Sequence, residues 1–125
     1  MLKFLEKKSW LAWGFAFLIA GFIFYTSSLS FKGYSIGEEK AFVYHSLSFF
    51  LLSFFLAVAL SKGKKEKLII LAFLIALAYA ASDEFHQLFV PGRVCSFSDF
   101  LVDASGIFFG SFLYWVYLRF GRKPA

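Results

Sequence analysis

The sequence predicts an all-α membrane protein, a four-helix transmembrane bundle with both termini in the cytoplasm. The chain is 60% hydrophobic, with 20 Phe among 125 residues, and its mean hydropathy is +0.71. The apolar residues form four runs of roughly the 20 residues that a helix needs to cross a bilayer core. Lys and Arg gather in short clusters between these runs. The length leaves room for a single domain, residues 1–125.

The four predicted spans cover about residues 9–29, 41–60, 68–90 and 97–118. Because the connections between them are short, we expect successive helices to be antiparallel neighbours. The first run is too long for the apolar part of a signal peptide, so we expect it to remain as the first span. The third run is purely apolar only from Leu68 to Ala81, about 21 Å of helix. That helix must therefore continue through the polar stretch 82–87 to cross the membrane.

The basic residues predict the orientation. In an alternating four-span topology, ten of the thirteen Lys and Arg residues fall on one side of the membrane. These ten are Lys3, Lys7, Lys8, Lys62, Lys64, Lys65, Lys67, Arg119, Arg122 and Lys123. The positive-inside rule places this side, and both termini, in the cytoplasm. Trp10, Trp13, Tyr114, Trp115 and Tyr117 are expected to form an aromatic belt at the same interface.

The net charge of +5 does not indicate a nucleic-acid partner, because the basic residues do not form a stripe on one face. The partners that the composition predicts are membrane lipids. The chain's oligomeric state is left open.

Polar residues cluster at the end of the third span, in the sequence Ser82-Asp83-Glu84-Phe85-His86-Gln87. Ionisable groups next to hydrocarbon are costly, so such a cluster is a functional-site hypothesis. At 100° per residue Asp83, His86 and Gln87 share one helix face, with Glu84 at its side. Small residues, which let helices pack closely in lipid, lie below on that face: Ala72, Ala76 and Ala80. The cluster is therefore expected to point into the bundle, on the extracytoplasmic side.

The fourth span carries a matching stripe of Asp99, Asp103, Gly106 and Gly110. The two glycines, four residues apart, indicate close helix packing. Asp99 lies near the helix start, where an acid can cap free N–H groups. Asp103 is a full turn deeper, so capping does not explain it, and we interpret it as a functional or network-forming residue.

Two further positions extend the predicted site. Arg93 follows the turn signal Pro91-Gly92, and its guanidinium either pairs with an acid or binds an anionic headgroup. His45 lies one turn inside the second span, at the expected depth of His86 and Asp103. The candidate binding residues are Lys40, His45, Asp83, Glu84, His86, Gln87, Arg93, Asp99 and Asp103. No established metal-ligand spacing is present, so neither a metal nor a cofactor is predicted.

These motifs resemble the VanZ-like family of membrane proteins. The resemblance is densest over Asp83-Glu84-x-His86-Gln87, Pro91-Gly92-Arg93, Asp99, Asp103 and Gly106-x-x-x-Gly110, and it continues weakly along the chain. Lys40 and His45 are similar to a Lys/His pair of the family's second helix, with one extra residue between them and Glu39 in place of an Asp. The resemblance implies a small four-helix protein of the bacterial cytoplasmic membrane. The family's founding member is associated with teicoplanin resistance, but the resemblance implies no particular reaction.

Three functions fit these residues. The first is an extracytoplasmic-side site that binds an envelope lipid, a cell-wall component or a lipophilic glycopeptide, without catalysis. The second is a membrane-embedded enzyme acting on a lipid-linked envelope substrate. Glu84 or Asp103 would then be the general base, His86 its acid–base partner and Arg93 an electrostatic stabiliser. The third is an ion-pair network that only holds the helices together. We favour binding over a structural role, and place the enzyme third because no nucleophile is evident.

Overall fold

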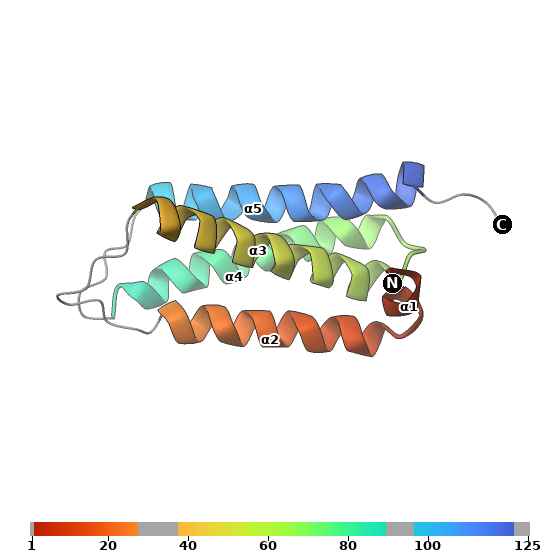
Figure 1. Cartoon of the computed structure of the whole chain (residues 1–125), viewed down its shortest axis with the longest axis horizontal. Helices are drawn as coiled ribbons and strands as arrows, with labels where there is room; N and C mark the ends of the chain where they lie inside the picture. The colour runs from red at the N-terminus through yellow and green to blue at the C-terminus, as the bar shows by residue number, and fades with distance from the viewer. Residues whose placement is uncertain (1, 28–37, 90–96, 122–125) are drawn as a thin grey trace.

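The computed structural model describes residues 2–27, 38–89 and 97–121, with the backbone alone for residues 38–42 and 45. Every regular element in these ranges is a helix. The elements are α1 (Leu2–Lys7), α2 (Ser9–Ser27), α3 (Glu38–Ser61), α4 (Lys67–Gln87), α5 (Phe97–Val116) and the short π-helix η1 (Tyr117–Gly121). Figure 1 shows α2 to α5 lying lengthwise beside one another. The all-helical prediction is confirmed for this part of the chain.

The helix bounds differ slightly from the predicted ones. α3 begins three residues before the expected Ala41, and α4 ends at Gln87, where Leu88 and Phe89 form a turn. The predicted end points Leu29 and Val90 lie outside the described residues. As expected, α4 continues past its apolar part and carries the polar residues 83–87 in its last turns.

Within the described ranges, three helical segments are long and apolar enough to cross a membrane: Ser9–Ser27, Lys67–Gln87 and Phe97–Gly121. The apolar part of α3, Ser46–Ser61, is shorter. α3 nevertheless has the most central position, since it contacts α1, α2, α4 and α5. These lengths and compositions are those of a membrane protein.

Small side chains bring the helices together. Ala72, Ala76 and Ala80 are fully buried, which confirms the predicted inner face of α4. On α5, a Cβ atom added at Gly106 would overlap the carbonyl oxygen of Ser46, and one at Gly110 would overlap that of Phe50. Both glycines therefore let the α5 backbone lie directly against α3, as small residues do in membrane helix pairs.

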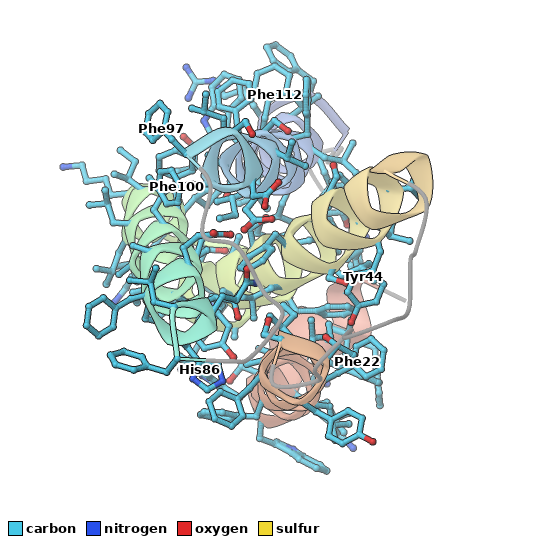
Figure 2. All side chains as sticks on the ribbon, turned by 90° about the vertical axis from the view of Figure 1, so that its left-hand side faces the viewer. Phe22, Tyr44, His86, Phe97, Phe100 and Phe112 are labelled. Carbon is cyan, nitrogen blue, oxygen red and sulfur yellow. The ribbon has the colours of Figure 1, made fainter. Side chains whose placement is uncertain are left out.

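The distribution of polarity is inverted relative to a water-soluble globule. Large aromatic side chains such as Phe22, Phe97 and Phe112 are exposed on the outside, as Figure 2 shows. Charged residues, by contrast, are buried between the helices, among them Asp83, Glu84 and Asp103. Such an arrangement suits an apolar surrounding, because hydrocarbon does not penalise exposed Phe but does penalise exposed carboxylates.

The two ends of the bundle differ in charge. α1, the α3–α4 connection and η1 all lie at one end (Figure 1). This end, which we call the basic end, carries these Lys and Arg residues: Lys3, Lys7, Lys8, Lys62, Lys64, Lys65, Lys67 and Arg119. The opposite end carries Asp83, Glu84, Asp99 and Asp103. We call it the acidic end.

Candidate functional site

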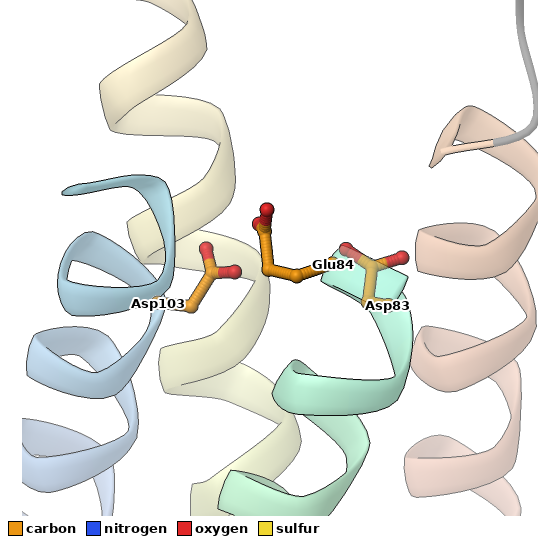
Figure 3. A group of neighbouring side chains, drawn as sticks. All are labelled: Asp83, Glu84 and Asp103. Atoms are coloured by element: carbon orange, nitrogen blue, oxygen red, sulfur yellow. The ribbon is translucent and has the colours of Figure 1, made fainter. Parts of the chain in front are cut away.

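Three carboxylates from two helices converge at the acidic end. Asp83 and Glu84 come from the last turns of α4, and Asp103 comes from the second turn of α5. One oxygen of each lies within 4.8 Å of the others. Figure 3 shows Asp103 and Glu84 between their helices, with Asp83 on the other side of Glu84. We call Asp83, Glu84 and Asp103 the carboxylate cluster.

The carboxylate cluster is buried. Asp103 has no exposed surface, while Asp83 and Glu84 are 4% and 5% exposed. Two packing contacts place it there: the buried alanine face of α4 directs Asp83 inward, and Gly106 holds α5 against α3 one turn below Asp103. Gln87, also buried, donates a 3.2 Å hydrogen bond from Nε2 to Oδ2 of Asp83.

His86 has a different environment from the one expected. Its ring is half-buried and stacks on Phe24 of α2, with 4.7 Å between ring centroids and 23° between planes. Figure 2 shows His86 beside α2, on the side of α4 away from α5. The helical angle predicted that His86 shares the face of Asp83 and Gln87. In the structure its imidazole packs instead against the neighbouring helix α2.

In the part of the chain that the structure describes, Asp99 lies outside the carboxylate cluster. Its side chain is exposed in the first turn of α5. The predicted alignment of Asp99 with Asp103 is an angle along α5, and the burial seen at Asp103 does not extend to Asp99. The side chains of Lys40 and His45, and all of Arg93, lie outside the part of the chain that the structure describes. Their predicted roles stay predictions.

The polar end of the first span contacts α3. Tyr44 donates a 2.5 Å hydrogen bond from its hydroxyl to Oγ1 of Thr26, whose single proton is shared between the carbonyls of Phe22 and Ile23, each 3.0 Å away. Tyr79 of α4 donates to the carbonyl of Ala20. Tyrosine hydroxyls therefore link α2 to both α3 and α4. Sequence reasoning missed these links, since neither Tyr44 nor Tyr79 stands out in an aromatic-rich chain.

A second buried polar group lies at the basic end and corrects the aromatic-belt prediction. Tyr114 is completely buried. It donates a 2.8 Å hydrogen bond to Oε1 of Glu6 in α1 and accepts one of 3.2 Å from Oγ of Ser61. It is therefore an internal hydrogen-bonding residue, whereas Trp10 is 68% exposed as a belt residue would be. The sequence carries a signal for this burial: Tyr114 follows Gly110 by four residues, which places it on the inner stripe of α5.

The three side chains of the carboxylate cluster share one chemical character, since ionised carboxylates only accept hydrogen bonds. Two ionised carboxylates about 5 Å apart repel by roughly 3 kcal/mol at an effective dielectric of about 20. Groups that donate hydrogen bonds or carry positive charge offset this repulsion, and the amide of Gln87 is one such donor. Ammonium and hydroxyl groups of a ligand would act likewise. The oxygen donor set would also suit a hard cation such as Mg²⁺ or Ca²⁺. The chain spacing did not predict this set, because the third acid comes from another helix.

The comparison with known families supports the resemblance noted in the sequence. A family model described as VanZ/LLP1 matches residues 12–118. The chain belongs to the VanZ/LLP1 family. The match covers α2 to α5 almost completely, and so includes every described member of the carboxylate cluster. Neither a curated protein nor a solved structure matches the chain. Together with the three apolar helices, the VanZ/LLP1 assignment indicates a membrane protein.

Proposed function

We propose that this VanZ/LLP1 protein is a bacterial cytoplasmic-membrane protein that binds the polar part of an envelope molecule at its acidic end. In this proposal α2, α3, α4 and α5 all cross the membrane, and both termini are cytoplasmic. The ligand is an envelope lipid, a cell-wall component or a lipophilic glycopeptide. Binding of a glycopeptide would link the protein to teicoplanin resistance.

The distribution of charge supports the orientation. Eight Lys and Arg residues lie at the basic end in the described part of the chain, and positive residues favour the cytoplasmic side. The acidic end then faces the cell envelope. The central packing of α3 supports a fourth span, since a helix that contacts α2, α4 and α5 shares their membrane depth over most of its length.

The observation that carries the binding proposal is the convergence of Asp83, Glu84 and Asp103 in a buried position. Buried carboxylates are costly in a membrane helix and mark functional sites more often than packing positions. Carboxylate oxygens accept hydrogen bonds and attract cationic groups. Sugar hydroxyls and amino groups are complementary to such oxygens, and lipid-linked sugars and glycopeptides both carry them. The apolar surface of the helices would accommodate the lipophilic part of the same molecule.

Paired substitutions on α5 test the proposal. Asp103→Asn removes the charge of a completely buried carboxylate, and Asp99→Asn removes that of an exposed one a turn earlier. A hydrogen bond to a charged group contributes about 1.5–3 kcal/mol, so Asp103→Asn should weaken ligand binding roughly tenfold or more. Asp99→Asn should leave it unchanged.

Binding would be measured on the full chain in nanodiscs, with fluorescently labelled teicoplanin and with a bacterial envelope lipid extract followed by mass spectrometry. Equal effects of Asp103→Asn and Asp99→Asn would contradict the proposal. So would a wild-type protein that retains neither teicoplanin nor any lipid of the extract.

A second candidate is a membrane-embedded enzyme acting on a lipid-linked envelope substrate. It is favoured by the approach of the Glu84 and Asp103 carboxylates, because paired acids can divide general acid and base roles. The stacking of His86 on Phe24 of α2 makes it a weaker candidate for their proton-transfer partner. Purified protein incubated with envelope lipids and varied divalent cations would yield a new product if this candidate were correct.

A further inference from the structure

A groove opens between α4 and α5 on the membrane-facing side of the bundle, towards the basic end. Its volume is about 350 Å³, within the range of small-molecule sites. Its walls are apolar and mostly aromatic, formed by Ile70, Phe73, Phe108, Phe112 and Trp115. From Lys67 to Phe73 it extends about 9 Å along the helix axis. It is separate from the carboxylate cluster, which lies at the other end of the same two helices.

The mouth of the groove is basic. Lys67 lines it and is exposed, and Lys64 and Lys65 precede it in the α3–α4 connection. Glu66 also lines the mouth, but its carboxylate is paired with the guanidinium of Arg119 at 3.4 Å. With Glu66 and Arg119 neutralising each other, the net charge at this position is that of the lysines. An anionic group is the complementary partner.

We propose that this groove binds an anionic phospholipid, with an acyl chain between α4 and α5 and the phosphate beside Lys67. The aromatic walls contact the chain. A second copy of the protein is the less suitable occupant. Two copies inserted in the same orientation bring their basic ends together, so Lys67 would meet like charge.

The apolar part of the proposal is tested by filling the groove. Ile70 is 64% exposed and lines the groove, whereas Leu74, one turn further, is 54% exposed and does not line it. Ile70→Trp and Leu74→Trp therefore add the same bulk on the outer surface of α4. Native mass spectrometry of the full chain in detergent, titrated with phosphatidylglycerol, should show about tenfold weaker binding for Ile70→Trp and no change for Leu74→Trp.

Substitutions of lysines at the mouth of the groove test the recognition of the lipid phosphate. Lys67→Gln should weaken phosphatidylglycerol binding about fivefold, the effect of one basic residue near an anionic lipid. Lys64→Gln, which does not line the groove, should weaken it less. Wild-type protein should bind phosphatidylglycerol more tightly than phosphatidylcholine.

Three results would overturn the proposal. Equal binding of the two lipids would show that the phosphate is not recognised by charge. Equal effects of the two tryptophan variants would exclude the groove. A change of oligomeric state in Ile70→Trp, with phosphatidylglycerol binding intact, would assign the groove to a second copy of the chain.

Discussion

The substitution Gly106→Ala tests the close contact between α5 and α3, one turn below Asp103. A Cβ atom at residue 106 would overlap the backbone carbonyl of Ser46. Since a backbone carbonyl cannot rotate away as a side chain can, the two helices would have to separate. Overpacking of this kind costs about 1–3 kcal/mol. The gain in helix propensity from Gly to Ala, about 0.5–1 kcal/mol, offsets part of that cost. The net loss in unfolding free energy should therefore be about 1–2 kcal/mol.

The matched control is Gly14→Ala in α2. A Cβ atom there meets nothing within 4 Å, so only the propensity gain of about 0.5–1 kcal/mol remains. Gly106→Ala should thus be less stable than wild type and Gly14→Ala more stable, with about 1.5–3 kcal/mol between the two variants. Unfolding by SDS titration in mixed micelles, followed by far-ultraviolet circular dichroism, would measure both. If Gly106→Ala and Gly14→Ala have the same stability, the close approach of α5 to α3 is wrong.

Two other pairs test the interior. Tyr114→Phe removes the hydroxyl that donates to Glu6 and should lower the unfolding free energy by about 1–3 kcal/mol. Tyr117→Phe is the control, and equal stabilities would refute the buried network. Ala80→Leu inserts bulk at a completely buried position and Ala81→Leu at the adjacent exposed one. Ala80→Leu should lower the unfolding free energy by about 1–3 kcal/mol, and Ala81→Leu should leave it unchanged. Thermal unfolding in detergent would measure both. If Ala81→Leu were the less stable variant, the buried face of α4 would be wrong.

Much of the fold follows from sequence because apolar length and small-residue spacing are local signals. The run beginning at Leu68 is too short to cross alone, and that deficit correctly predicts a helix continuing to Gln87. The spacing of Ala72, Ala76 and Ala80 correctly predicts which face is buried. α1 was not predicted, since a six-residue helix has too few turns for a periodic pattern.

The site was predicted less completely, because a helical angle fixes a direction but not what lies in that direction. Asp99 and Asp103 share a stripe, yet Asp103 is completely buried and Asp99 is exposed. His86 packs on Phe24 because α2 is present at its height. The hydrogen bond between Tyr114 and Glu6 joins residues 108 positions apart. A contact between such distant residues depends on how all the helices pack, which no local pattern encodes.

The central claim is that the carboxylate cluster is a binding site and not a structural ion-pair network. The most direct measurement compares ligand affinity and detergent unfolding temperature for Asp83→Asn, Glu84→Gln and Asp103→Asn in the full chain. A binding site predicts that affinity falls roughly tenfold or more in protein that is still folded, while the unfolding temperature changes little. A structural network predicts a sharp fall in unfolding temperature for all three variants, with affinity lost only in proportion to the fraction unfolded. That second result would contradict the account.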